Sequence, residues 1–256
     1  MRVITFATIK GGVGKTVLAV HVAAALAAKG VRTLLVDLDP QGHGTLLAGV
    51  DAEPTAPCVG DALQQGGADR LPSVIVREVR PCLSVAPAVL RMAVQERQLY
   101  AWALRLRALV RALETLPEAP EAVVCDTPPH IGAYTEAALH AADLTIAPVP
   151  ALAGSLQGFG DLRAAWTEMQ DGRKGELAAV VNLWDGRTGA TNRAMEEAIG
   201  QLSARVLSTK IPRAEAINQA ALSHALLFDH APTHPAAGMF YELAAEVWTI
   251  AKAVRP

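Results

Sequence analysis

Aromatic residues, cysteines and long apolar runs are scarce in this sequence. Although 51% of the 256 residues are hydrophobic, only 4% are aromatic, so the core must be built mainly from Ala, Val and Leu. The three cysteines, Cys58, Cys82 and Cys125, are an odd set without CxxC spacing, which argues against a disulfide framework. We find neither the roughly 18 consecutive apolar residues of a membrane span nor a signal-peptide pattern. These absences predict a reduced, cytoplasmic protein.

Charge is also low and balanced. The formal net charge is −2, so no global electrostatic field attracts the protein to nucleic acid or to a membrane, and any such surface must be local. A chain of 256 residues can bury about three quarters of its unfolded surface, which is enough for one large core. We therefore expect residues 1–256 to form a single domain.

A glycine-rich segment, residues 10–16, lies between an apolar run at 3–7 and a helical pattern at 17–29. This order of strand, turn and helix is that of a phosphate-binding loop, because the N–H groups of the turn and the helix N-terminus attract anions. The Lys15 ammonium can reach the outer phosphates, and the Thr16 hydroxyl can ligate Mg²⁺. The residues expected to contact the nucleotide here are Gly11, Gly12, Val13, Gly14, Lys15, Thr16 and Val17.

A second lysine, Lys10, opens this loop, and Ile9 occupies the position where the usual phosphate-binding loop has glycine. Two lysines supply more positive charge than one triphosphate requires. One explanation is that Lys10 contacts a nucleotide held by another subunit. A glycine-rich turn with lysines by chance is the alternative, but it leaves the preceding strand and the following helix unexplained.

Carboxylates follow two further apolar strands. Asp37 and Asp39 follow the strand expected at 31–36, and Asp126 ends the strand expected at 122–126. Acids at the carboxyl ends of parallel strands lie where such sheets bind ligands. Beside a phosphate loop they predict Mg²⁺ coordination through water and orientation of a nucleophile. The alternative for the first pair is a capped turn, since Asp-Pro and Gly are common turn residues.

Other residues near these motifs have less specific expected roles. Cys125 points away from Asp126, so we expect it to fill the core. His130 follows the same strand and could face the phosphates, although a lone loop histidine is more often incidental.

Two further groups of residues are ambiguous. Residues 70–111 contain eight arginines against two acids, which is either a solvated helix face or a partner surface. His224, His230 and His234 do not predict a metal site, because Pro232 breaks the helical face that would bring the last two together.

Apolar strands and helical patterns alternate along the rest of the chain. Further strands are expected at 83–87, 144–149, 177–183 and 205–211, and helices at 92–114, 131–141, 155–170, 190–202 and 235–254. Such alternation predicts an α/β fold with a mostly parallel, twisted sheet and helices on both faces.

Three motifs together resemble the ParA/MinD group of P-loop ATPases, which carry a deviant Walker A box. Residues 10–16 (KGGVGKT) are similar to that box, residues 37–42 (DLDPQG) to its A′ box and residues 123–129 (VVCDTPP) to its Walker B box. The stretches 142–149 and 211–213 also resemble ParA/Soj-type partition ATPases. The resemblance covers nearly the whole chain and implies a single P-loop ATPase domain.

The resemblance implies a homodimer that holds two molecules of ATP with Mg²⁺ between its subunits. Lys10 would reach the partner's phosphates, whereas Lys15 and Thr16 would serve the nucleotide of their own subunit. Asp39 would position the attacking water, and hydrolysis would be slow and stimulated by a partner. The residues implied in the magnesium site are Thr16, Asp37 and Asp126.

The adenine contacts are implied by position alone. Asn182 ends one expected strand and Pro212 follows the next, where relatives contact the base. An asparagine at a strand end can equally cap the following turn.

ParA proteins bind DNA without sequence preference as ATP dimers, and a ParB-like activator stimulates hydrolysis and releases them. The chain resembles the short form without an N-terminal helix-turn-helix domain, so sequence-specific autorepression is not expected. The stretch 173–213 has seven basic residues against four acids, and a second arginine that is common in relatives is replaced by Ala216. The residues implied in DNA binding are Arg187, Lys210 and Arg213.

The resemblance leaves several functions open. One is a nucleoid-associated partition ATPase for a plasmid or chromosome, and another is an orphan ATPase that positions a protein assembly along the nucleoid. A MinD-like membrane switch needs a basic amphipathic C-terminal helix, for which Lys252 and Arg255 alone are a poor match. An iron–sulfur reductase needs cysteines at a dimer face, which Cys82 and Cys125 do not offer. A small-molecule kinase would not explain Lys10.

Overall fold

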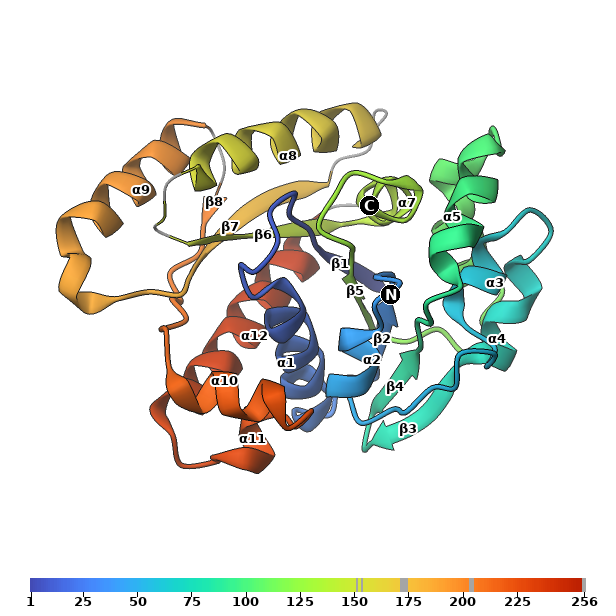
Figure 1. Cartoon of the computed structure of the whole chain (residues 1–256), viewed down its shortest axis with the longest axis horizontal. Helices are drawn as coiled ribbons and strands as arrows, with labels where there is room; N and C mark the ends of the chain where they lie inside the picture. Colours follow the sequence, from blue (N-terminus) through green and yellow to red (C-terminus); the bar gives the residue numbers. More distant parts are fainter. Residues whose placement is uncertain (151, 153, 171–174, 203–204, 255–256) are drawn as a thin grey trace.

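Eight strands in the described part of the chain form one sheet, in the order β3-β4-β2-β5-β1-β6-β7-β8 (Figure 1). The structure is a computed structural model that describes residues 1–150, 152, 154–170, 175–202 and 205–254. The strands are β1 (Arg2–Phe6), β2 (Thr33–Asp37), β3 (Val76–Arg80), β4 (Leu83–Ala86), β5 (Ala122–Asp126), β6 (Leu144–Pro150), β7 (Glu176–Asn182) and β8 (Arg205–Val206). Neighbouring strands are parallel except β3 and β4, which are antiparallel. The predicted mostly parallel α/β sheet is confirmed.

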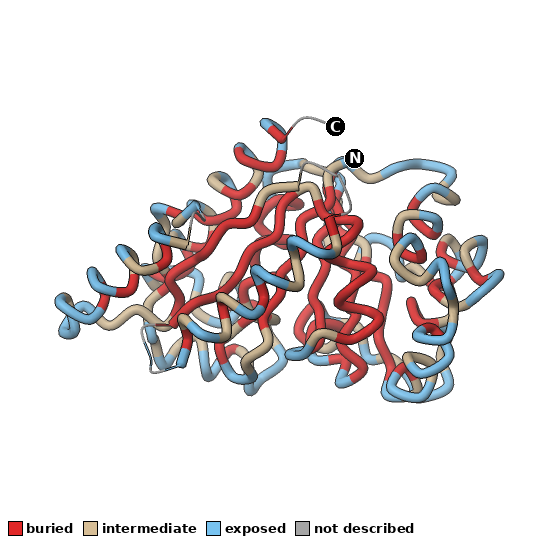
Figure 2. The backbone as a smooth tube through the Cα atoms, turned by 90° about the horizontal axis from the view of Figure 1, so that it is seen from above, coloured by how far each residue is buried: buried red, intermediate tan, exposed pale blue. Residues whose placement is uncertain are grey.

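Helices cover both faces of this sheet, and the strands in its middle are buried, whereas the edge strands β3 and β8 are partly exposed (Figures 1 and 2). The longer helices are α1 (Lys15–Ala28), α5 (Met92–Ala101), α6 (Ala108–Glu114), α7 (Ala133–Ala141), α8 (Ser155–Gln170), α9 (Gly189–Gln201), α10 (Glu215–Leu222) and α12 (Pro235–Ala253). The short ones are α2 (His43–Leu47), α3 (Val59–Leu63), α4 (Leu71–Val74) and α11 (Leu227–His230), with 3₁₀ turns η1 (Ala68–Arg70), η2 (Arg105–Arg107) and η3 (Gly186–Thr188).

Strand β5 shows how the two faces of the sheet are separated. Val124 packs in the cluster formed with α1 and α12, whereas Val123 and Cys125 pack in the cluster formed with α6 and α7. Successive side chains of a strand point to opposite faces, so an almost wholly apolar strand supplies both cores. Cys125 is fully buried, as predicted, and burial raises the pKa of its thiol to about 12.

The single helix predicted at 92–114 is wrong. Helix α5 ends at Ala101, because Trp102 adopts an extended backbone, and α6 begins only after the turn η2. The Arg105 Nε donates to Glu136 Oε2 of α7 at 2.9 Å, which holds this break against the neighbouring helix. The apolar spacing is nearly the same on both sides of the break, so periodicity alone could not reveal it.

The strand predicted at 205–211 is much shorter than expected. Among the described residues, β8 consists of Arg205 and Val206. The N–H groups of Leu207 and Ile211 still donate to the Ala179 and Val181 carbonyl oxygens of β7, at 2.8 and 3.1 Å, but the residues between them do not continue the ladder. The N–H groups of Ser208 and Thr209 donate to the Glu246 carboxylate of α12 at 2.7 and 2.9 Å instead of to a neighbouring strand. Strand β3 and the short helices α2 to α4 were not predicted. Across the described residues, none of the helices has both the length and the apolar character required to cross a bilayer.

His21 joins α1, the helix that follows the phosphate loop, to the C-terminal part of the chain. Its Nδ1 lies 2.7 Å from the Val17 carbonyl oxygen, and the Leu227 N–H donates to its Nε2 at 2.9 Å. The ring also stacks on Phe240, with 4.2 Å between centroids. Because Nε2 accepts a hydrogen bond, the ring is neutral with its proton on Nδ1. Burial lowers the pKa of His21 to about 4.

We expect His21 to make the free energy of unfolding fall by about 2 kcal/mol between pH 7.5 and pH 5. The unfolded ring titrates near 6.5 and the folded ring near 4, so the unfolded state gains the proton first and stability is lost as the pH falls through this window. Urea unfolding at both pH values measures the loss. His21→Phe should be less stable at pH 7.5, since the Leu227 N–H loses its acceptor, but should lose about 2 kcal/mol less on acidification. Equal losses in the two proteins would contradict the role of His21.

Candidate functional site

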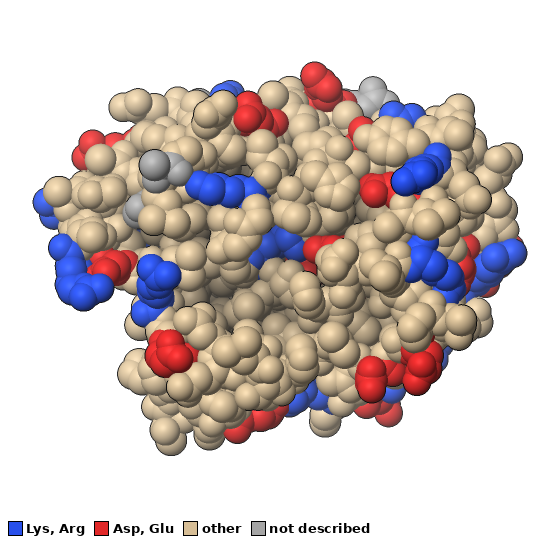
Figure 3. Space-filling model, viewed as in Figure 1, with Lys and Arg blue, Asp and Glu red and all other residues tan. Residues whose placement is uncertain are grey.

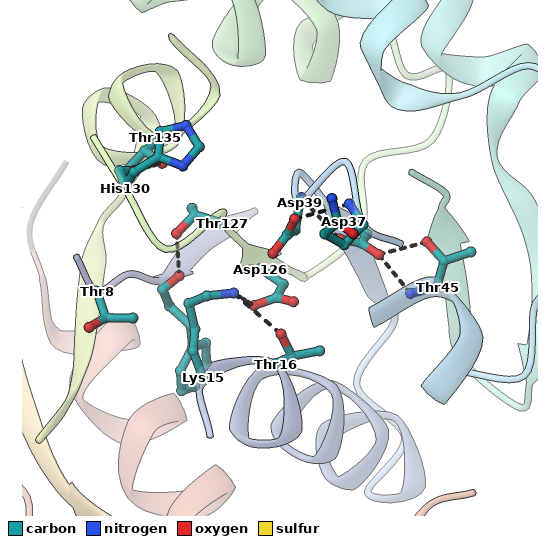
Figure 4. Close-up of polar contacts among 12 residues, drawn as sticks. Thr8, Lys15, Thr16, Asp37, Asp39, Thr45, Asp126, Thr127, His130 and Thr135 are labelled. Carbon is teal, nitrogen blue, oxygen red and sulfur yellow. Dashed lines mark hydrogen bonds and ion pairs between the residues drawn. The ribbon is translucent and has the colours of Figure 1, made fainter. Parts of the chain in front are cut away.

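The carboxyl ends of β1, β2 and β5 meet at one edge of the sheet, where the phosphate loop begins (Figure 4). In the parallel register, Asp126 is the partner of both Phe6 on β1 and Asp37 on β2. Open parallel sheets bind ligands at this edge. The fold therefore places the loop and two acids from distant parts of the sequence side by side.

The loop owes its shape to two glycines with left-handed backbones, Gly12 at φ 74° and Gly14 at φ 78°. A β-carbon on Gly14 would also lie 2.5 Å from Asn182 Nδ2, so no larger side chain fits there. Helix α1 begins at the next residue, Lys15, and its first N–H groups have no partner within the helix. The predicted residues from Gly11 to Val17 thus form the loop and first turn of an anion-binding helix N-terminus.

Lys15 and Asp126 form a buried ion pair at the centre of the site (Figure 4). The Lys15 side chain is 6% exposed and the Asp126 side chain is fully buried. The ammonium Nζ bonds Asp126 Oδ1 and also lies 3.3 Å from the Thr16 hydroxyl. Burial raises the pKa of Asp126, against the opposing effect of Lys15. Figure 3 shows a hollow near the centre of this face, in which a basic and an acidic side chain lie together.

The second oxygen of Asp126, Oδ2, is buried without a hydrogen-bond partner in the described residues. Together with the Thr16 hydroxyl and Asp37, it provides oxygen donors of the kind that Mg²⁺ prefers. No group of three or more His, Cys, Asp or Glu side chains in the described ranges could hold a metal ion alone. A magnesium ion here would therefore take its remaining ligands from water and phosphate oxygens, as is usual for nucleotide sites.

Asp37 accepts three hydrogen bonds from neighbouring residues. Its Oδ2 accepts from both the N–H and the hydroxyl of Thr45 at 2.7 Å, and its Oδ1 accepts from the Asp39 N–H at 3.1 Å. Burial, followed by the charge of Asp126, raises its pKa to about 7. A bound cation would favour the ionised form of such a carboxyl group.

Asp39 lies at the start of the loop after β2 and is 8% exposed. Its Oδ1 accepts from the Gln41 N–H at 3.0 Å. The two acids therefore do cap this turn, which was the alternative considered from the sequence. Figure 4 shows that Asp39 nevertheless lies at the same site as the Lys15 and Asp126 pair.

Lys10 and His130 lie on the rim of the site. The Lys10 ammonium is 3.8 Å from the position of a β-carbon on Gly154, so its side chain extends along the loop before α8 of its own subunit. His130 is half exposed, and its Nε2 lies 3.6 Å from Glu96 Oε2 on α5. Figure 4 shows His130 apart from the ion pair of Lys15.

Asn182, a predicted adenine contact, is buried at the end of β7 and donates from Nδ2 to the Val13 carbonyl oxygen at 2.6 Å. The strand end is thus tied directly to the phosphate loop, a contact that no pattern in the sequence indicated. Pro212, the second predicted contact, forms an isolated parallel bridge with Trp184, two residues after Asn182.

The three predicted DNA-binding residues come together beyond this bridge. The Trp184 N–H donates to the Ile211 carbonyl oxygen at 2.9 Å and the Arg213 N–H donates to the Trp184 carbonyl oxygen at 3.0 Å, which joins the segments that carry Arg187, Lys210 and Arg213. Basic side chains gather at the left edge of the molecule in the region of α9 (Figure 3). Two residues of the same basic stretch, Arg173 and Lys174, lie outside the described residues.

Four of the eight arginines between residues 70 and 111 have partners within the fold. Three of them pair with acids on different elements, and these pairs are Arg80 with Asp229, Arg91 with Asp61 and Arg105 with Glu136. The Arg111 guanidinium lies over the Trp102 ring, 5.9 Å from its centroid. At these four positions the arginine excess serves packing and local ion pairing.

Comparisons with known proteins agree with this geometry. A family profile described as an AAA domain matches residues 1–179. The sporulation initiation inhibitor protein Soj of Bacillus subtilis is 32% identical over 252 residues, which cover 96% of this chain and 98% of Soj. The chromosome-partitioning ATPase Soj of Thermus thermophilus is 33% identical over 260 residues, which cover 96% and 95%.

Solved structures extend the likeness to the whole fold. Cobyrinic acid a,c-diamide synthase from Mycobacterium smegmatis, with bound ADP and magnesium, is 29% identical with a TM-score of 0.83 and covers 100% of this chain and 97% of its own. The ATP complex of a Cyanothece McdA variant has a TM-score of 0.84 at 19% identity, covering 97% and 96%, which shows the shared fold. From the near-complete match to both Soj proteins and the three nucleotide motifs gathered at one sheet edge, we conclude that this chain belongs to the ParA/Soj-type ATPases of the deviant Walker A family.

Proposed function

We propose that this protein is a partition ATPase, which binds ATP with Mg²⁺, dimerises around two nucleotides and in that state binds DNA without sequence preference. The observation that carries the proposal is the buried pair of Lys15 and Asp126, in which the second Asp126 oxygen has no hydrogen-bond partner among the described residues. A cation and a free carboxylate oxygen at a phosphate loop suit a nucleoside triphosphate with its magnesium ion. The likeness to chromosome-partitioning ATPases supports partition as the cellular role.

The chemistry requires positioning and charge neutralisation more than covalent catalysis. When ATP binds, the Lys15 ammonium contacts the outer phosphate oxygens, and the loop N–H groups bind the same phosphates. Thr16, Asp37 and Asp126 would hold Mg²⁺, directly or through water, and the ion would supply further charge neutralisation. Asp39 orients the attacking water, and the Gln41 N–H holds its carboxylate in place.

Dimerisation supplies the second lysine. In the proposed dimer, Lys10 contacts the phosphates of the partner's ATP, so hydrolysis depends on two subunits meeting. A lysine supplied by the partner also explains why the loop carries two cations. We further propose that hydrolysis is slow until a ParB-like activator stimulates it, that residues 1–256 act as one ATPase domain, and that the protein works in the cytoplasm on the nucleoid.

One observation favours a second candidate, an ATPase of the same kind that positions a protein cargo along the nucleoid. Ala216 on α10, which stands where relatives commonly have a DNA-contacting arginine, packs against the core. The neighbouring Glu215 is exposed and acidic. DNA affinity is therefore expected to be lower than in relatives, which suits a carrier that must move readily on DNA.

DNA binding tests the proposal. The Asp39→Ala protein should retain ATP and, with ATP, bind a non-specific DNA duplex. A plot of the logarithm of the DNA association constant against the logarithm of the salt concentration should then have a slope of roughly −4 to −5, because a dimer would neutralise about five phosphates. With ADP it should bind weakly. Fluorescence anisotropy across a salt series measures both states, and Arg213→Ala should flatten the slope by about one to two without changing the dimer mass. An ATP dimer without DNA affinity would exclude the DNA-binding role.

A further inference from the structure

Two of the three cations on the candidate DNA surface lie against carboxylates of the same surface. The Arg187 side chain is 90% exposed, yet its guanidinium donates to the Asp185 carboxylate through Nε at 2.9 Å and through a terminal nitrogen at 2.6 Å. Arg187, and more weakly Arg213, lowers the pKa of Asp185 to about 2. Asp185 therefore pairs directly with Arg187, one of the cations that are proposed to contact phosphates.

The second of these pairs joins Lys210 to a different acid, Glu196. The Lys210 ammonium lies 2.6 Å from Glu196 Oε1 on α9 and 4.2 Å from the centroid of the Trp184 ring. Both charged side chains are about one third exposed, so the pair is open to solvent and to a large anion. The three cations and two carboxylates leave this surface with a formal charge of only +1 per subunit.

The backbone beneath these pairs does not depend on the Asp185 charge. The fully buried Asn192 donates from Nδ2 to the Asp185 carbonyl oxygen at 2.8 Å, and the Thr188 N–H donates to the same oxygen at 3.0 Å. The only backbone contact of the carboxylate in the described residues is with the Arg187 N–H at 3.0 Å, and an asparagine oxygen can accept that bond equally well. Asp185→Asn thus removes charge without removing the turn.

We propose that Asp185 and Glu196 are internal counterions, which compete with DNA phosphates for Arg187 and Lys210 and thereby set the DNA affinity of each subunit. This inference rests on the proposed DNA-binding function and concerns its regulation. Exposed ion pairs are weak, so the phosphates of a DNA strand can displace both carboxylates. This displacement requires that several cations bind phosphates at the same time. A single subunit offers few such contacts and a two-fold dimer offers twice as many, so the counterions would make DNA binding depend more steeply on dimerisation.

The inference is tested with charge-neutral variants of the full chain, Asp185→Asn, Glu196→Gln and the double variant, each with a non-hydrolysable ATP analogue and a labelled non-specific duplex. Glu197→Gln is the matched control, because Glu197 is exposed on the same helix and pairs with no cation in the described residues. Each single variant should bind about tenfold more tightly near 0.1 M salt, with a salt slope steeper by about one to two, since each subunit frees one cation. Glu197→Gln should change the affinity by less than about twofold, because Glu197 holds none of the three cations and the field of an exposed charge is weakened by salt.

The outcomes separate this inference from the function on which it rests. If wild type binds DNA and the variants bind no more tightly, the counterion role is overturned and the DNA-binding function stands. If Glu197→Gln tightens binding as much as Glu196→Gln, the effect is one of overall charge, and the counterion role is again overturned. If neither wild type nor the double variant binds DNA as an ATP dimer, both proposals fall. Binding that appears only in the double variant would support the counterion role directly.

Discussion

Replacing Lys15 by alanine is expected to weaken ATP binding roughly 100-fold, because charge-assisted bonds to phosphate oxygens are lost from a buried position. Lys15 is 6% exposed and lies between Asp126 and the Thr16 hydroxyl, so solvent cannot replace its charge. Titration with ATP and Mg²⁺ by calorimetry measures the loss. Lys29→Ala is the matched control, since Lys29 follows the end of the same helix at an exposed position. ATP affinity within about threefold of wild type would contradict the role of Lys15.

The same substitution should also destabilise the nucleotide-free protein. Asp126 is fully buried, so removal of its cation leaves an unpaired carboxylate, which costs about 3 kcal/mol unless the group takes up a proton. A double variant, Lys15→Met with Asp126→Asn, removes both charges and should recover most of this loss without recovering ATP binding. Urea unfolding of the single and double variants separates the two effects. An unchanged stability of Lys15→Ala would show that the pair contributes nothing to folding.

Replacing Asp39 by alanine is expected to lower the hydrolysis rate by about 10² to 10⁴, which is the range for loss of a group that orients and polarises the attacking water. ATP binding should change little, because the Asp39 side chain bonds the Gln41 N–H rather than the phosphate-binding lysine. The ATP-bound dimer should therefore accumulate. Single-turnover phosphate release and light scattering with ATP measure the two results. A monomer under ATP, or hydrolysis close to the wild-type rate, would exclude this role.

Two further variants separate the charge of Asp39 from its part in the turn. Asp39→Asn keeps an oxygen that can accept from the Gln41 N–H, so it should preserve the turn and still lose hydrolysis. Asp51→Ala removes an exposed acid a short distance along the chain and should leave hydrolysis unchanged. Wild-type hydrolysis by Asp39→Asn would mean that Asp39 acts only through the turn.

The elements that could be predicted from the sequence are those whose pattern is local. A strand, a glycine-rich turn and a helix follow one another within residues 2–28, and the apolar composition of β5 and β6 marks buried parallel strands. The short elements α2, α3 and α4 were missed because four or five residues carry no usable periodicity. The break after α5 was missed because the contact that holds it, the bond from Arg105 to Glu136 on α7, joins residues too far apart in the sequence to appear in a local pattern.

Residue order alone was enough to establish the α/β class, the phosphate loop and the chemistry available at each motif, because spacing within a few residues controls backbone shape and residue type controls charge. The three-dimensional fold determined which of these motifs lie close together. The register of β2 against β5 places Asp37 beside Asp126, and Asn182 reaches Val13 across most of the chain. Likewise, the ion pair of Lys210 with Glu196 could not be predicted from the number of basic residues in the sequence. Such contacts depend on how helices pack on the two faces of the sheet, and that packing is a property of the whole chain.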